Sequence, residues 1–481
     1  NYNTTIGDEA GTAITTGDHN TAVGYSSLVA NTTGGQNTAS GFKAMFSNTT
    51  GEDNTATGYQ ALYANTTGAS NAAYGLFALT ANTTASNNTA VGHSSLKANT
   101  TGASNVAVGW EALKSNTTAV YNTAIGWMAL NVNTTGANNT ASGSMTLDAN
   151  TTGSRNAAFG YRALTSATTA NNNAAFGGYA LEANTTGQQN TAIGKSALTA
   201  NTTGSSNTAL GESALLANTT GAQNTSVGMQ SLLSNTTGTQ NTAVGYDSLD
   251  QNTTGTNNAA FGFASMEDNT TASENTAFGS HSLQKTTTGA KNTAVGSRAL
   301  SANTTGSFNT TLGNGAGKQI TTGIENVVIG YVAGSHNVNH TTGSRCVIIG
   351  AYADVTTSGA TDAQVIGQDV SGQGGYTTLG SGTADIRTAN GSTSWATVSD
   401  ERYKKDITTS TAGLSFINDL TPRTWNYKTL GELPETFSAY EADSTKVFKN
   451  TQTNHGFIAQ EVKAVIDSHS EIKDGFRLWD D

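Results

Sequence analysis

The sequence predicts an all-β protein, a parallel β-solenoid (β-roll) of 17-residue coils, followed by a small α+β domain. Asn recurs at 20 consecutive positions, every 17 residues from Asn3 to Asn326, and a fixed period of this kind is typical of stacked repeats. Charged residues form 11% of the chain, well below the ~25% usual for globular proteins. The composition changes at Ala396, which indicates a separate domain.

The first five residues of each repeat are expected to form a short strand. If the recurring Asn has offset 0, the copy at Asn20 reaches offset 4 at Gly24. Ala stands at offset 2, an apolar residue usually follows, and Gly ends the segment, which is a period-2 pattern closed by a turn residue. The small residues predict close approach of a neighbouring backbone, and Gly permits a positive φ.

The rest of the repeat is expected to turn the chain back. Offset 5 varies from Trp110 to Lys195, which predicts contact with solvent or a ligand. Offset 8 is Leu or Met from Leu28 to Leu300 and is expected to be buried. Offsets 11 to 14 read Asn-Thr-Thr-Gly, a turn cluster. One coil is therefore expected to hold two short strands and two turns, and stacking would align identical Asn residues in hydrogen-bonded ladders.

The repeat pattern becomes less regular towards its C-terminal end. Offset 8 becomes Gly317 and then Gly334, and three extra residues separate Asn326 from Cys346. Residues 354–395 are rich in Gly, Ser and Thr, whereas the last 86 residues hold 24 of the 55 charged residues. We therefore expect a solenoid shaft over 1–353, a cap and neck over 354–395, and a distinct domain over 396–481 with a helix at 413–420.

Charge and composition argue against several functions. The net charge of −11 and the lack of a basic stripe disfavour a nucleic-acid partner. No apolar run approaches the ~20 residues of a membrane span, so no membrane insertion is expected. Cys346 is the single cysteine, which excludes an intrachain disulfide. No cofactor is expected, because the run from Gly313 to Lys318 lacks the spacing and the Ser or Thr of a phosphate-binding loop.

Three features of the repeats allow alternative interpretations. His336 and His340 could hold a metal ion at a fibre axis, or could be two exposed side chains of a loop insertion. The Asn-Thr-Thr triplets match the N-glycosylation acceptor, or serve only as turns. Aromatic residues recur at offset 5 and could form a sugar-stacking stripe or an ordinary exposed scatter: Tyr25, Tyr59, Trp110, Trp127, Tyr161 and Tyr246.

The repeat pattern Asn-Thr-Ala-x-Gly-x-x-Ala-Leu resembles the parallel β-roll repeats of trimeric adhesin heads and of phage and virus tail fibres. This resemblance covers roughly residues 1–353. It implies a homotrimer that is located in a virion tail fibre or at a cell surface. The implied partner is a glycan or protein of the host cell surface.

The last domain resembles the endosialidase-type intramolecular chaperone in three ordered segments, 399–407, 422–427 and 455–462. The family's motif is matched by Ser399, Asp400, Arg402 and Lys404, and the third segment contains Gly456, Gln460 and Glu461. The resemblance implies a domain that trimerises, templates the β-structured shaft and then cleaves itself off. The family usually ends in a longer helical tail, so we expect the domain to be incomplete at Asp481.

The implied chemistry is serine–lysine autoproteolysis at the Val398–Ser399 bond. Ser399 would be the nucleophile, and Lys404 would act as a general base in its neutral form, which requires burial to lower its pKa. The spacing of five residues places the two side chains on different faces of a helix or strand, so a turn or a neighbouring chain must bring them together. His455 would either orient this pair or simply pack.

A structural fibre or adhesin shaft for host attachment is therefore the first hypothesis. The alternative is a tail-spike enzyme that degrades a surface polysaccharide. That chemistry needs a pair of carboxylates in a groove. The acidic residues of the repeats are few and stand at variable offsets, for example Glu111, Glu182 and Glu212, which disfavours the alternative.

Overall fold

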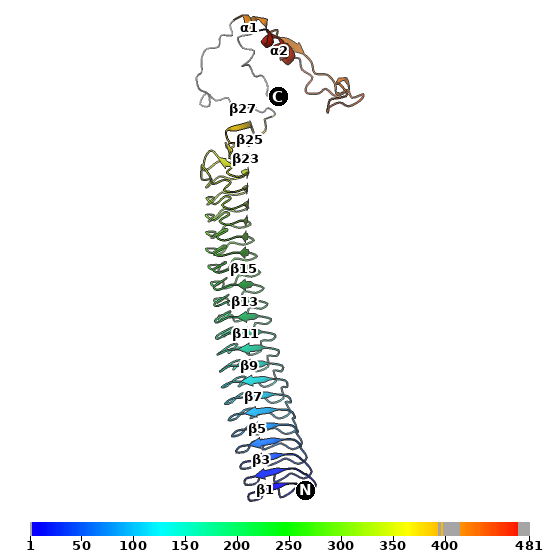
Figure 1. Cartoon of the computed structure of the whole chain (residues 1–481), viewed down its shortest axis with the longest axis vertical. Coiled ribbons are helices and arrows are strands. Elements are labelled where there is room, and N and C mark those ends of the chain that lie inside the picture. The colour runs from blue at the N-terminus through cyan, green and yellow to red at the C-terminus, as the bar shows by residue number, and fades with distance from the viewer. Residues whose placement is uncertain (1, 393–395, 398–413, 470–481) are drawn as a thin grey trace. The chain divides into compact units, whose positions relative to one another are not determined.

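A computed structural model of the chain describes residues 2–392, 396–397 and 414–469. The chain divides into two compact units, Asn1–Val398 and Ser399–Asp481. The first unit is a parallel β-solenoid, which confirms the predicted fold class (Figure 1). Among the described residues, no helix has the length and apolar character needed to cross a membrane.

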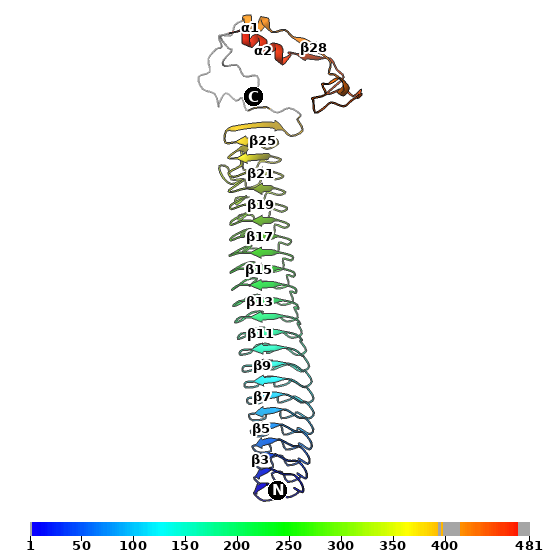
Figure 2. The same cartoon turned by 45° about the vertical axis from the view of Figure 1, so that its right-hand side comes forward.

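Each repeat contributes one three-residue strand to a continuous parallel sheet, and strands of neighbouring coils pair in register, as Thr21 does with Thr38 (Figure 2). The strands are β1 Thr4–Ile6, β2 Thr21–Val23, β3 Thr38–Ser40, β4 Thr55–Thr57, β5 Ala72–Tyr74, β6 Thr89–Val91, β7 Val106–Val108, β8 Thr123–Ile125, β9 Thr140–Ser142, β10 Ala157–Phe159, β11 Ala174–Phe176, β12 Thr191–Ile193, β13 Thr208–Leu210, β14 Thr225–Val227, β15 Thr242–Val244, β16 Ala259–Phe261, β17 Thr276–Phe278, β18 Thr293–Val295, β19 Thr310–Leu312, β20 Val327–Ile329 and β21 Val347–Ile349.

The prediction of a second strand in each coil is wrong. Between Gly24 and Asn37 the chain forms turns and bends, although its backbone still bonds to the next coil, for example from Leu28 N to the Ala44 oxygen over 3.1 Å. The reason is the backbone conformation. Ser26, Leu28 and Gln36 have φ values of 51°, 53° and 58°, and left-handed residues interrupt an extended segment.

The interior of a coil is filled by small and branched apolar side chains. Ala22 and Leu28, at offsets 2 and 8, are both 0% exposed, as predicted. The glycine at offset 4 is required twice over: Gly24 has a φ of 128°, and a Cβ there would lie 2.6 Å from the Gly41 oxygen. The close approach of backbones that the small residues predicted is thus confirmed.

Two internal asparagine ladders run through the solenoid. At offset 0, as predicted, Asn37 donates from its backbone N–H and its Nδ2 to Oδ1 of Asn20, over 3.0 and 3.1 Å. A second ladder stands at offset 11, where Nδ2 of Asn48 donates to Oδ1 of Asn31 over 2.8 Å. The Gly51 carbonyl accepts from both Asn37 and Asn48 and so links the ladders. Most buried amides are thereby paired. Oδ1 of Asn150, Asn269 and Asn303 has no hydrogen-bond partner in the described structure, because Ala167, Thr286 and Ile320 interrupt the offset-11 ladder.

The sheet continues past β21. The following strands are β22 Asp354–Val355, β23 Gln364–Gln368, β24 Ser371–Gly372, β25 Tyr376–Ser381, β26 Ala384–Ala389 and β27 Ala396–Thr397. β23 and β25 extend the parallel stack, and β26 then pairs antiparallel with β25. Asp354 holds the three-residue insertion between Asn326 and Cys346. Its buried Oδ2 accepts hydrogen bonds from the backbone N–H groups of residues 336 to 338 over 2.8–3.0 Å.

The second unit contains α1 Leu414–Asp419, β28 Arg423–Trp425, the 3-10 helix η2 Leu430–Glu432, β29 Asn454–Gly456 and α2 Ala459–Ser468. The helix expected at 413–420 is therefore present as α1. β28 and β29 pair antiparallel, with Thr424 opposite His455. Gly456 lies against an aromatic ring, because a Cβ there would be 3.0 Å from Cη2 of Trp425.

Candidate functional site

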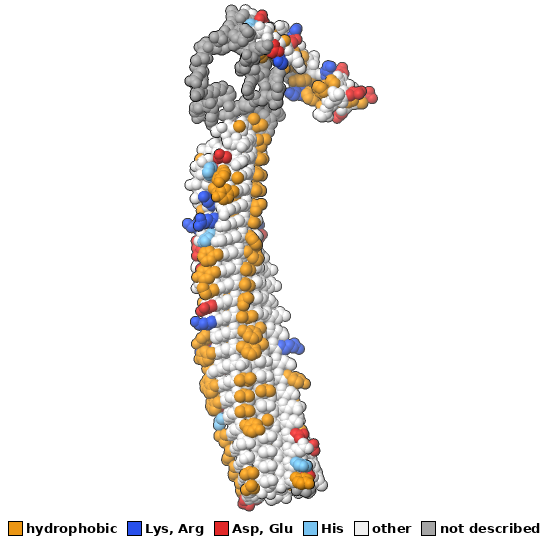
Figure 3. Space-filling view, in the orientation of Figure 1, with side chains coloured by type: hydrophobic (Ala, Val, Ile, Leu, Met, Phe, Trp, Pro, Cys, Tyr) orange, Lys and Arg blue, Asp and Glu red, His pale blue; other side chains and the backbone are white. Residues whose placement is uncertain are grey.

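The outward side of the solenoid sheet carries no charged side chain from β1 to β21. We call the side chains at offsets 1 and 3 of these strands the strand face. Offset 1 is Thr, Ala or Val, and offset 3 is mostly a large apolar residue. Ile125, Leu210 and Phe278, all at offset 3, are 45%, 44% and 58% exposed. Figure 3 shows hydrophobic side chains gathered in columns along this unit.

The strand face has the character of an interaction surface. Scattered exposed apolar residues are normal, but a contiguous apolar surface marks a binding site for protein or membrane. The rings of Phe159 and Phe176 already stack here, with centroids 4.8 Å apart. No ion must be desolvated when this face is covered, so its burial is favourable.

A second column, at offsets 5 and 6, consists of rings that stack from coil to coil. The centroids of Tyr25 and Phe42 are 5.4 Å apart, those of Phe42 and Tyr59 5.0 Å, and those of Trp110 and Trp127 5.7 Å, all nearly parallel. The rings in these three pairs face each other, whereas Tyr59 and Phe77, and Tyr161 and Tyr179, meet edge to face at 89°. That geometry favours support of the stack over a sugar-stacking stripe, which needs free ring faces.

The two histidines of the insertion are separated by the fold. His336 is exposed, and its ring centroid lies 4.6 Å from that of Tyr352. His340 is 0% exposed, with Nε2 3.4 Å from Oδ1 of Asn326, and burial lowers its pKa to about 4. The interpretation as two exposed histidines is wrong for His340, because His340-Thr341-Thr342-Gly343 takes the place of a ladder Asn-Thr-Thr-Gly. No group of three or more His, Cys, Asp or Glu within the described ranges could hold a metal ion.

The acidic residues named for the enzymatic alternative each face a cation. Glu111 pairs with Lys114 over 2.8 Å, and Glu182 with Arg162 over 2.9 Å. A different acidic cluster was missed by the sequence analysis, because its members stand at three offsets. It consists of Asp247, Asp250, Glu267 and Asp268. Burial and mutual repulsion raise the pKa values of its three aspartates.

The predicted autoproteolytic residues lie mainly outside the described residues. These are Val398, Ser399, Asp400, Arg402 and Lys404. His455, which lies in β29, is exposed, as is Gln460 in the first turn of α2. Glu461 accepts from Nε of Arg423 over 2.9 Å, so it ties α2 to β28.

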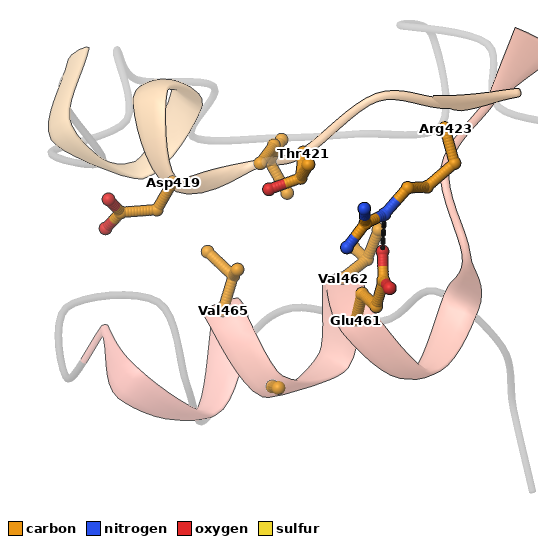
Figure 4. A pocket seen from close by; sticks show the side chains of 8 residues that line it. Asp419, Thr421, Arg423, Glu461, Val462 and Val465 are labelled. Atoms are coloured by element: carbon orange, nitrogen blue, oxygen red, sulfur yellow. Dashed lines mark hydrogen bonds and ion pairs between the residues drawn. The ribbon is translucent and has the colours of Figure 1, made fainter.

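A pocket of about 200 Å³ lies between the end of α1, β28 and α2. Figure 4 shows Asp419, Thr421 and Arg423 on one side, and Glu461, Val462 and Val465 on the other. The Arg423–Glu461 pair bridges the two sides. The Asp419 carboxylate lies 2.9 Å from Nε2 of His469, beyond the end of α2. These two ion pairs connect α1 and β28 with α2 and the residue that follows it.

The fold defines a class, a repetitive β-solenoid followed by a small domain of helices and strands. The family described as chaperone of endosialidase matches residues 399–470, the second unit. The chain thus carries an endosialidase chaperone domain after a solenoid of 17-residue coils, a combination that fits a tail fibre or adhesin shaft with a chaperone. A search of curated proteins gave no match.

Proposed function

We propose that this protein is a homotrimeric fibre or adhesin shaft for attachment to a host surface. Residues 1–353 would form the shaft, 354–395 the cap and neck, and 396–481 a chaperone that trimerises the chain and cleaves it at Val398–Ser399. The observation that carries the proposal is that one chain combines an uncharged, exposed strand face with a chaperone domain of a family found in phage tail fibres.

The strand face favours copies of the same chain as its occupant. A partner with the same 17-residue period can match the face coil for coil along its whole length, whereas a globular partner covers only a few coils. Each coil is too thin to bury much apolar area by itself, because its interior holds mainly alanines and one Leu or Met in most coils, beside the asparagine ladders. Association would bury the remaining apolar column.

Charges placed on the strand face test this proposal. The triple variant Ile125→Glu, Leu210→Glu, Phe278→Glu should sediment as single chains, whereas the unchanged protein should sediment as three copies, because buried unpaired carboxylates oppose association. The matched control places Glu at three exposed offset-5 positions, Tyr161, Met229 and Phe263, and should stay trimeric. Single chains for the unchanged protein, or equal behaviour of both variants, would refute the trimer through this face.

The acidic cluster gives the enzymatic alternative one structural candidate. Carboxyl groups with raised pKa values are what a general acid requires. A reducing-sugar assay on capsular polysaccharides, with Asp250→Asn as the comparison, decides between the functions. Release of sugar ends that depends on Asp250 would favour the tail-spike enzyme over the attachment shaft.

A further inference from the structure

Two thirds of the cations on the solenoid have an acidic or an aromatic partner among the described residues. The first 395 residues contain 12 Lys and Arg. Six of them form ion pairs with described acidic residues: Lys114, Arg162, Lys195, Lys291, Arg345 and Arg387. Two more, Lys43 and Lys97, lie 5.2 and 5.0 Å from phenylalanine ring centroids. Four cations remain, and three of them converge on one groove.

This groove has a volume of about 350 Å³ and spans three successive coils. Its lining residues are Gln284, Lys285, Arg298, Ser301, Ala302, Lys318 and Gln319. The coils are held in contact by bonds from Lys285 N to the Ser301 oxygen and from Ala302 N to the Lys318 oxygen, both 3.1 Å. Lys285, Arg298 and Lys318 form no ion pair within 4.0 Å with the part of the chain that the structure describes.

The positions of the three cations suit a bound anion. Lys285 and Arg298 are exposed, and Lys318 is half-buried, with its Cδ 3.6 Å from where a Cβ on Gly315 would stand. Each cation is free to bond an incoming oxygen without first breaking an ion pair.

Acidic residues limit where that anion can lie. In the preceding coil, the Glu267 carboxylate accepts a hydrogen bond from Nε2 of Gln284 over 2.8 Å. The Asp268 carboxylate in the same coil interacts electrostatically with Lys285. Asp250 stands one coil further back. These carboxylates would repel an anion from the Lys285 end of the groove and favour a position between Arg298 and Lys318.

We propose that this groove binds the carboxylate or phosphate groups of an acidic polysaccharide. The inference deepens the proposed attachment function and rests on it. Gln284, Ser301 and Gln319 supply donors and acceptors for sugar hydroxyls between the cations. The lining contains no aromatic ring on which a base could stack, and three cations are few for a nucleic-acid backbone. The groove uses offsets 6, 9 and 10, so covering the strand face at offsets 1 and 3 leaves it open.

Binding of defined polymers to the full chain tests the proposal, with polygalacturonate as the carboxylate, a phosphomannan as the phosphate and dextran as the neutral probe. At least one acidic polymer should bind, more weakly at high ionic strength, and dextran should not. Lys318→Gln and Arg298→Gln should each weaken binding by about threefold to tenfold. The matched control is Arg155→Gln, an exposed solenoid cation outside the groove, which should bind like the unchanged protein.

Several outcomes would contradict the proposal that this groove binds an acidic polysaccharide. These are no binding of either acidic polymer, equal binding of dextran, tighter binding of single-stranded DNA, or an equal loss in Arg155→Gln. Sedimentation of the same samples measures the number of chains in the assembly, and so tests the trimer separately from the binding of polymers. The groove substitutions do not alter the strand face. A trimer that does not bind acidic polymers removes only the groove, whereas single chains that bind them remove only the trimer.

Discussion

His340 is a titratable side chain in a position that most coils fill with asparagine. Its Nδ1 has no hydrogen-bond partner in the described structure, and its imidazole is fully buried. The preceding coil carries Ile320 at this offset, and an asparagine in place of His340 would have no proton to gain. His340 therefore introduces a pH dependence into one end of the stack.

We predict that the cap around His340 loses stability as the pH falls from 6.5 towards 4. Burial lowers the pKa of His340 to about 4 from an ordinary 6.5, so the unfolded chain binds the proton first and the folded state is disfavoured. The full loss corresponds to roughly 3 kcal/mol. Amide hydrogen exchange of residues 326–360 at pH 7 and pH 4.5 measures it.

Two substitutions sharpen this test. His340→Asn should remove the acid-induced opening, because an asparagine side chain does not titrate in this range. His336→Asn is the matched control at an exposed position and should open like the unchanged protein. Acid opening that persists in His340→Asn would contradict the assignment.

At the scale of the element, the coil is set by the glycine that ends each strand. Gly160 has a φ of 128°, and a Cβ there would lie 2.7 Å from the carbonyl carbon of Gly177. Both the conformation and the contact exclude a side chain, and the contact is with backbone that cannot move aside. The coil can therefore stack at this distance only with glycine at offset 4.

Gly160→Ala should destabilise the coils around β10 and β11 by about 3 kcal/mol or more, since left-handed strain alone is worth ~1–3 kcal/mol. Limited proteolysis near residue 160 would report the opened coils. Gly178→Ala is the matched control, because a Cβ there lies 4.0 Å from the Tyr161 oxygen in ordinary contact. It should stay within ~0.5 kcal/mol of the unchanged protein. Equal protease resistance of both variants would show that the contact is not limiting.

At the scale of the whole molecule, a long solenoid needs a mechanism that starts stacking in one register. The repeat itself does not provide one, because neighbouring coils are closely similar and a slip by 17 residues still aligns the offset-0 asparagines. A detachable trimeric template would fix the first register. The need for such a template supports the proposed role of residues 396–481 as a chaperone that later cleaves itself off.

We predict that Ser399→Ala and Lys404→Met each keep the chain whole on a denaturing gel, whereas the unchanged protein yields two fragments. The reason is that the first substitution removes the nucleophile and the second the general base. Lys405→Met is the matched control next to the proposed base and should still cleave. Two fragments from Ser399→Ala, or an uncleaved Lys405→Met, would contradict the proposed dyad.

The period, the buried Leu28 row, the offset-0 ladder and the glycine at offset 4 were all predictable, because they depend only on residues that repeat at one position. The three segments that resemble the endosialidase-type chaperone were also predictable, because their motifs are short runs of neighbouring residues. The second strand was predicted wrongly, because the left-handed φ of Ser26 and Leu28 belongs to residue types that rarely adopt it. The dyad of Ser399 and Lys404 stays a prediction.

Stacking of like residues follows from the sequence alone, since a 17-residue period places each side chain above its equivalent, and the burial of offset 8 follows from its constant Leu or Met. The exposure of the uncharged side chains of β1–β21 and the burial of His340 are evident only in the structure. The tertiary structure also brought Lys285, Arg298 and Lys318 together from three coils. The direction in which a side chain points depends on the turns of its coil. Those turns are set by left-handed backbone angles at residues such as Ser26 and Leu28, whose residue types do not predict them.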